Sequence, residues 1–143
     1  MKTKNMIFLI VVFFLMLYGC VSMYEVNNPD ACEKLSGYNQ INCYLKVAKA
    51  MAKDYTVPVS RVASVCQKID NNVYEDQCYF SAATYRLLNP NNGEYETFYL
   101  CNKMNSRDYK DQCYLFLAVE TNDSRYCDYI GGNRWTKFLN RIK

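Results

Sequence analysis

The sequence contains no histidine, and it has only 3 prolines, 5 glycines and 1 tryptophan among its 143 residues. The absence of histidine excludes Ser-His and Cys-His catalysis and every metal site that needs a histidine ligand. No stretch has the alternating Val, Ile and Thr pattern that is typical of strands. With 17 Lys and Arg against 14 Asp and Glu, the chain also lacks the basic excess of a dedicated nucleic-acid binder. Its length fits one small domain.

The first twenty residues have the pattern of a secretory targeting segment. Lys2 and Lys4 provide a positive start, and residues 6–18 carry no charge. That apolar stretch is short for a membrane-spanning helix, which needs about 20 residues. The sequence LYGC that ends at Cys20 is similar to the lipobox of prokaryotic lipoproteins, which implies a lipid attached to Cys20. An uncleaved membrane anchor and plain secretion are the alternatives.

The targeting segment predicts where the remainder of the chain lies. The positive-inside bias keeps the two N-terminal lysines in the cytoplasm, so everything after residue 20 faces outward. We therefore expect a membrane-anchored protein that faces the outside of the cytoplasm. The chain divides into a signal peptide or anchor over residues 1–20, a linker over residues 21–28 and a helical domain over residues 29–143.

An internal repeat organises the predicted helical domain. The aligned stretches are ACEKLSGYNQINCYLKVA from Ala31, VCQKIDNNVYEDQCYFSAA from Val65 and LCNKMNSRDYKDQCYLFLA from Leu100. In each, Lys follows the first Cys by two positions, and Tyr directly follows the second Cys. A fourth copy begins at Tyr126 and lacks the second Cys, because Leu139 stands at that place.

A period of about 35 residues is the size of one helical hairpin, as in helical solenoids. The pattern Asn28-Pro29 and the polar Ser60 predict two helix starts. We expect an all-α fold, a short solenoid of about 3.5 disulfide-stapled helical hairpins after the N-terminal segment. The repeats are predicted near residues 29–59, 60–94 and 95–122, with a partial copy over 123–143.

The cysteines outside the targeting segment are expected to form disulfides, because an oxidising compartment favours them. One scheme closes each hairpin, since its two cysteines are equidistant from a polar turn. A second scheme links each repeat to the next. The spacings of 11, 12 and 12 residues within the hairpins favour the first scheme. Its pairs are Cys32–Cys43, Cys66–Cys78 and Cys101–Cys113, with Cys127 free.

The linking scheme remains open at this stage, because the midpoints of its pairs also fall in connections. It would pair Cys43 with Cys66, Cys78 with Cys101, and Cys113 with Cys127, and it would leave Cys32 free. A zinc site needs Cys pairs two to four residues apart, and the sequence has none. We therefore expect no metal and no cofactor.

Two short motifs resemble a known architecture. The motif C-x-K-I at residues 66–69 and the motif D-x-C-Y at residues 76–79 and 111–114 resemble signatures of uncharacterised, often archaeal, membrane-associated proteins. Those proteins carry Cys-bearing helical-hairpin repeats of about the same period. The resemblance implies an architecture and no established activity. The period is also similar in shape to tetratricopeptide solenoids.

The sequence contains 14 tyrosines, and their positions separate packing residues from binding candidates. Tyr44, Tyr79 and Tyr114 are part of the repeat, so we expect them to pack in the core. The aromatic residues beside the Asn-Gly loop are not fixed by the repeat, and they are candidate binding residues. These candidates are Tyr95, Phe98 and Tyr99.

Other polar motifs have simpler expected roles. Four acids recur near helix starts, where the helix dipole favours them, so an acid–base role is not expected: Glu75, Asp76, Asp108 and Asp111. Asn122 begins an Asn-Asp-Ser glycosylation sequon. Residues 133–143 contain four bases and no acid, which indicates a positive patch that could contact anionic lipid.

The sequence has no Gly-rich phosphate loop and no nucleophile elbow, so it predicts a non-enzyme. The favoured hypothesis is a membrane-tethered repeat protein that binds a protein or cell-surface partner or supports the envelope. The alternative is a thiol-redox or covalently dimerising envelope protein that uses an unpaired cysteine. Under the first disulfide scheme that cysteine is Cys127, two residues from Arg125.

Overall fold

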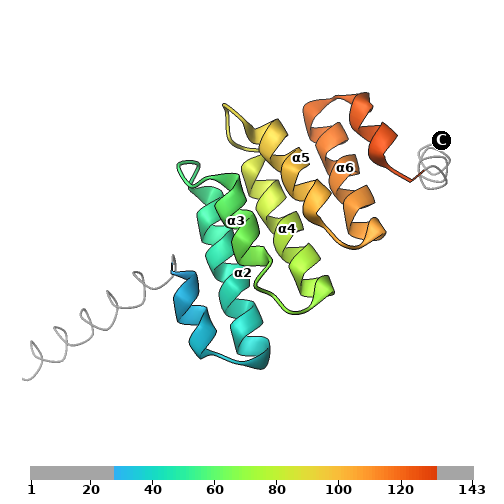
Figure 1. Cartoon of the computed structure of the whole chain (residues 1–143). Helices are drawn as coiled ribbons and strands as arrows, with labels where there is room; N and C mark the ends of the chain where they lie inside the picture. Colours follow the sequence, from blue (N-terminus) through green and yellow to red (C-terminus); the bar gives the residue numbers. More distant parts are fainter. Residues whose placement is uncertain (1–27, 132–143) are drawn as a thin grey trace, which may run out of the picture.

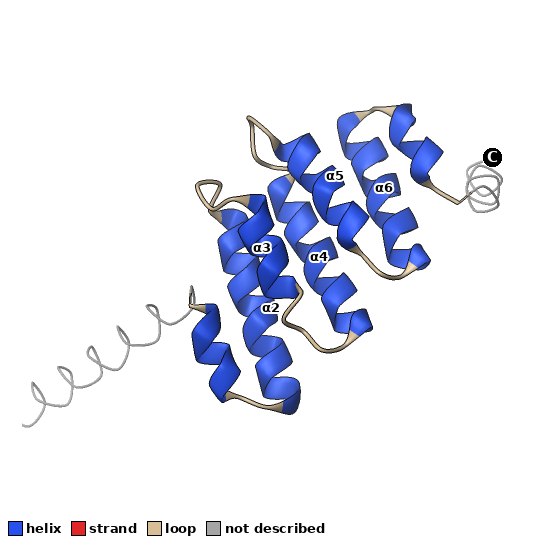
Figure 2. Cartoon of the chain, in the orientation of Figure 1, coloured by secondary structure: helices blue, strands red, loops and turns tan. Residues whose placement is uncertain are grey.

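The computed structural model describes residues 28–131, and this part of the chain consists of helices joined by loops, without a strand (Figure 2). The expectation of an all-α fold is confirmed for these residues. The predicted signal or anchor segment, the lipidation site at Cys20, most of the linker and the basic C-terminal patch lie outside the described residues. The elements are η2 Pro29–Lys34, α2 Gly37–Lys53, α3 Val59–Cys66, α4 Asn72–Arg86, α5 Gly93–Lys103, α6 Arg107–Thr121 and η3 Ser124–Tyr129, where η marks a 3-10 helix.

Successive helices pair in chain order, and the pairs lie side by side. Figure 1 shows the helices running roughly antiparallel in a row, with the first and last described residues at opposite ends. The second helix of each pair contacts the second helix of the next, so α4 packs against both α2 and α6. The first helices α3 and α5 also contact each other. A helical repeat of about 35 residues therefore recurs along the described chain.

Local sequence sets where the helices begin. The Asn28 side chain caps η2 by accepting a hydrogen bond from the Asp30 N–H at 3.1 Å, and Pro29 occupies the first turn, as predicted. The predicted cap at Ser60 is wrong, because α3 begins at Val59 and Ser60 lies within its first turn. Pro58 precedes it with an extended backbone, and its carbonyl accepts the first hydrogen bonds of the helix.

The three disulfides close the helical pairs. They join Cys32 to Cys43, Cys66 to Cys78 and Cys101 to Cys113, with Cα–Cα separations of 5.6, 5.6 and 5.5 Å. These are the pairs of the within-hairpin scheme. Helix axes usually lie 8–10 Å apart, so each bond needs an unusually close approach near the turn. Among the described residues, Cys127 has no disulfide partner.

Two aspartates connect the second helices to later turns. Asp76 on α4 is fully buried, and its carboxylate accepts the N–H groups of Asn105 and Ser106 at 2.6 and 2.8 Å. Asp111 stands one repeat later on α6, and it accepts the N–H of Gly131 at 3.2 Å. Each carboxylate therefore fixes the turn that follows the first helix of the next copy. The helix-dipole explanation of these acids is incomplete, because both also accept hydrogen bonds from the next repeat.

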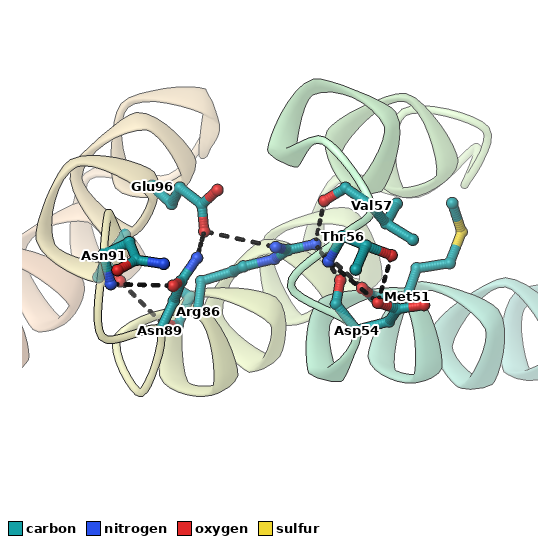
Figure 3. Close-up of polar contacts among 10 residues, drawn as sticks. Met51, Asp54, Thr56, Val57, Arg86, Asn89, Asn91 and Glu96 are labelled. Carbon is teal, nitrogen blue, oxygen red and sulfur yellow. Dashed lines mark hydrogen bonds and ion pairs between the residues drawn. The ribbon is translucent and has the colours of Figure 1, made fainter.

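A buried arginine joins three parts of the chain at the end of α4. The Arg86 guanidinium has no exposed surface, and it donates to the backbone carbonyls of Met51, Asp54 and Val57 (Figure 3). It also pairs with the Glu96 carboxylate on α5 at 3.4 Å. The contacts hold the α2–α3 turn, the end of α4 and the start of α5 in fixed positions.

The first residue of α5 lies unusually close to the end of α4. A Cβ atom at Gly93 would lie 2.5 Å from the Leu87 carbonyl oxygen and 2.8 Å from the Arg86 carbonyl oxygen. Backbone atoms cannot move aside as a flexible side chain can, so only glycine fits this approach. Replacing Gly93 with Ala is expected to lower the free energy of unfolding by about 1–3 kcal/mol, measured by urea titration.

Gln77→Ala is the matched control for this substitution, because Gln77 is an exposed helical residue of α4. Alanine has a higher helix propensity than glycine, so an equal or higher stability of Gly93→Ala would contradict the steric argument.

Within residues 28–131, none of the helices combines the length and the apolar content that crossing a membrane requires.

Candidate functional site

An open cleft of about 800 Å³ lies between the α4–α5 turn and the last described helix, η3. Residues 89–93 of the α4–α5 turn form one side, and the first two turns of α5 continue it. The last turn of α6 and the helix η3 form the other side. The cleft therefore joins the third repeat to the start of the fourth.

The wall of the cleft is a cluster of aromatic rings in tilted and edge-to-face contact. Phe98 is central, because its ring centroid lies 5.8 Å from that of Tyr126 and 5.0 Å from that of Tyr129. Tyr114 supports the wall from α6, with its centroid 5.8 Å from Phe98 and 5.2 Å from Tyr129. The Tyr114 hydroxyl donates to the Asn102 side chain at 2.7 Å, which fixes its ring. Separations of this size are favourable for aromatic pairs.

Two lining tyrosines remain largely open to solvent. Tyr95 is 69% exposed and Tyr129 is 51% exposed. Large exposed aromatic side chains that gather in one cleft are typical of binding sites, because they bury much area with few rotatable bonds.

The charged groups of the cleft are mainly acidic. Glu94 accepts a hydrogen bond from the Tyr126 hydroxyl, and Glu120 lines the opposite side. Burial and the Glu94 carboxylate raise the pKa of Tyr126 to about 12, so this phenol stays protonated and continues to donate at neutral pH. The Arg125 guanidinium also lines the cleft, but its Nε donates to both Asp123 oxygens at 3.0 and 2.8 Å.

The floor of the cleft is connected to the buried arginine. Asn89 lines the cleft and donates to the Glu96 carboxylate at 3.1 Å, and Glu96 in turn pairs with Arg86. The Asn89 side-chain oxygen accepts the Asn91 N–H at 3.1 Å, which shapes the turn (Figure 3). The cleft is therefore built on side chains that are already fixed.

The structure places two of the three predicted binding residues in the cleft. Tyr95 and Phe98 line it, whereas Tyr99 does not. The Lys103 ammonium lies 5.4 Å from the centroid of the Tyr99 ring, so this ring already has a cationic partner. Tyr95 and Phe98 are three positions apart in α5, and Tyr99 follows Phe98 directly, so its side chain leaves the helix in a different direction.

Sequence reasoning missed Tyr126 and Tyr129, which complete the site from η3. Their copy of the repeat is truncated, and the described part of it forms a short 3-10 helix rather than an α-helix. The signal that could have identified them is the departure of this copy from the pattern of the other three. The repeat tyrosines Tyr44, Tyr79 and Tyr114 are buried, as expected for packing residues.

The environment of Cys127 favours the protonated thiol. Burial raises its pKa, and the neighbouring acids Asp128 and Asp123 raise it further. Arg125 is hydrogen-bonded to Asp123, so the base that the sequence placed near the thiol is occupied elsewhere. A reactive cysteine needs a stabilised thiolate, and these contacts work against one.

The glycosylation candidate lies at the end of a helix. Asn122 is exposed and caps the C-terminus of α6 with a left-handed backbone at φ 54°. Asparagine tolerates this conformation better than most residues do, so the local fold already explains its presence.

Within residues 28–131, no three Cys, Asp or Glu side chains gather closely enough to hold a metal ion.

The fold and the cleft define an all-helical protein with disulfide-closed helical pairs and an aromatic, acidic cleft at one end. No family model matches the chain, and no curated protein or solved structure is significantly similar to it. The function is therefore argued from the geometry of the cleft.

Proposed function

We propose that this protein is a membrane-tethered binding scaffold that faces the outside of the cytoplasm and takes its partner in the aromatic cleft. The observation that carries the proposal is the cluster of Tyr95, Phe98, Tyr126 and Tyr129 around a cleft of about 800 Å³. A cleft of this size with a few fixed polar groups is typical of ligand-binding sites. The proposed action is binding without catalysis.

The rigid frame around the cleft supports this role. A disulfide joins α5 to α6, and both helices contribute lining residues. Arg86 and Glu96 fix the turn that carries Asn89. A preorganised site loses little conformational freedom when a ligand binds, so a larger part of the contact energy remains as affinity.

The proposed location and architecture rest on the sequence together with the disulfides. Three disulfides in a domain this small are typical of proteins outside the cytoplasm. They are compatible with the proposed targeting segment over residues 1–20 and with lipidation at Cys20. The repeated pairs support a short solenoid of about 3.5 hairpins, similar to the uncharacterised membrane-associated repeat proteins. The alternative of thiol chemistry has less support, because the pKa of Cys127 is raised.

Site-specific photo-crosslinking in cells that express the full chain tests the cleft directly. We expect a benzophenone amino acid at Tyr95 to give a cross-linked product of increased mass, because Tyr95 is exposed at the cleft. The matched control is Tyr38, which is 66% exposed against 69% for Tyr95 and lies in the first turn of α2. Equal products from both positions, or none from Tyr95, would overturn the proposal.

The tether is tested separately by the intact mass of protein extracted from membranes and alkylated before reduction. We expect a lipid adduct on a chain that begins at Cys20, with one alkylated thiol. A full-length mass without lipid would replace the lipoprotein with an uncleaved anchor. Recovery of the protein only in the soluble fraction would contradict the tether and leave the cleft proposal intact.

A further inference from the structure

We infer that the ligand of the cleft carries an alkylammonium group, which the aromatic rings and carboxylates of the cleft bind together. This inference rests on the proposed function, since it names the ligand class of the same cleft. Aromatic ring faces carry partial negative charge, so a desolvated ammonium group is attracted to them. The cleft offers four lining rings and two carboxylates in one space.

The charge of the cleft favours a cation over an anion. Glu94 and Glu120 both line it and both are exposed. Among the described residues the single lining base is Arg125, and the Asp123 carboxylate accepts two hydrogen bonds from its Nε, so its charge is locally neutralised. An anionic ligand would have to approach two carboxylates, and residues 28–131 offer it no free base in the cleft lining.

The same type of contact already occurs three times, on two rings, within the described residues. The ammonium groups of Lys49 and Lys53 lie 5.4 and 4.9 Å from the centroid of the Tyr85 ring. Lys103 covers Tyr99 in the same way. Within residues 28–131, no lysine or arginine covers a ring of the cleft wall, so these faces are left for an external cation.

The size of the cleft indicates what else the ligand must contain. A volume of about 800 Å³ exceeds that of an ammonium group alone, and the lining also includes the side chains of Asn91 and Thr121. The ligand therefore extends beyond its cation as a polar or alkyl chain. A choline-type head group and a lysine side chain share this chemistry.

Titration with small probes tests the inference and separates these two sources. The full chain, labelled in its Tyr and Phe rings, is titrated with choline, with N-acetyl-lysine amide and with 3,3-dimethylbutan-1-ol, the uncharged isostere of choline. We expect choline or the lysine amide to shift the ring resonances of Phe98, Tyr126 and Tyr129. The uncharged isostere should bind at least about 10-fold more weakly, because it has the same shape without the charge.

Paired variants identify the groups responsible. Glu120→Gln is expected to weaken binding of the charged probe about 3-fold and to leave the isostere unchanged. Tyr129→Ala should weaken the charged probe about 5-fold. Asp70→Asn and Tyr38→Ala are the matched controls, because both residues are exposed and lie outside the cleft lining.

The outcomes separate this inference from the proposed function. Equal binding of choline and its isostere, or no ring shift with either charged probe, would overturn the ammonium inference. If cross-linking at Tyr95 still succeeded, the cleft would remain a binding site for a different chemistry. Loss of the cross-link together with specific choline binding would instead overturn the proposed macromolecular partner.

Discussion

Replacing Arg86 with Met is expected to lower the free energy of unfolding by about 3–5 kcal/mol, because it leaves the buried Glu96 carboxylate without its positive partner and removes the guanidinium donor from three backbone carbonyls. The guanidinium is fully buried, and its bonds to the carbonyls of Met51 and Val57 are 3.0 and 2.7 Å long. Methionine fills a similar length but donates nothing. Urea denaturation followed by circular dichroism measures the loss.

Two further variants make the Arg86 result interpretable. Arg61 is an exposed residue of α3, and Arg61→Met is expected to change stability by less than about 0.5 kcal/mol. Adding Glu96→Gln to Arg86→Met should recover part of the loss, because the remaining carboxylate is then uncharged. A loss below about 1 kcal/mol in Arg86→Met would show that the buried contacts contribute little.

Removing the central disulfide by Cys66→Ala together with Cys78→Ala is expected to cost about 3 kcal/mol. The bond closes a loop with a sequence separation of 12 residues, and it lies between two helices that each contact other repeats. In the chain-entropy account the loss arises because the unfolded chain gains freedom. A second contribution comes from the two buried sulfurs that alanine does not replace.

Cys127→Ser provides the control for the disulfide variant, because Cys127 is unpaired among the described residues. It is expected to change stability by less than about 1 kcal/mol. Adding a reductant should lower the urea midpoint of the wild-type chain more than that of the double variant. An unchanged wild-type midpoint under full reduction would show that the disulfides do not stabilise the fold.

Only some of the residues that line the cleft could be predicted from the sequence. Tyr95 and Phe98 were identifiable because they lie beside a breaker-rich turn and are not fixed by the repeat. Tyr99 satisfied the same criteria, yet it pairs with Lys103 outside the cleft. The choice between neighbouring tyrosines depends on helix phase and on what packs beside it, and neither is visible in the turn motif.

The roles of Asp76 and Arg86 were beyond the reach of local sequence patterns. The partners of Asp76 lie 29 and 30 residues away, and those of Arg86 on the α2–α3 turn lie 29 to 35 residues away. An acid near a helix start is equally compatible with a favourable dipole contact and with a bond to another repeat. Only the packing of successive pairs distinguishes these two possibilities.

The sequence by itself determined the helical class, the period of about 35 residues and the cysteines available for pairing. These properties follow from spacing, because a helical hairpin has a fixed length and recurring residues mark its turns. The tertiary structure decided the disulfide pairs, the connection of Arg86 to three carbonyls and the gathering of rings from α5 and η3 into one cleft. Those outcomes depend on distances between residues that are far apart in the chain, and packing alone sets such distances.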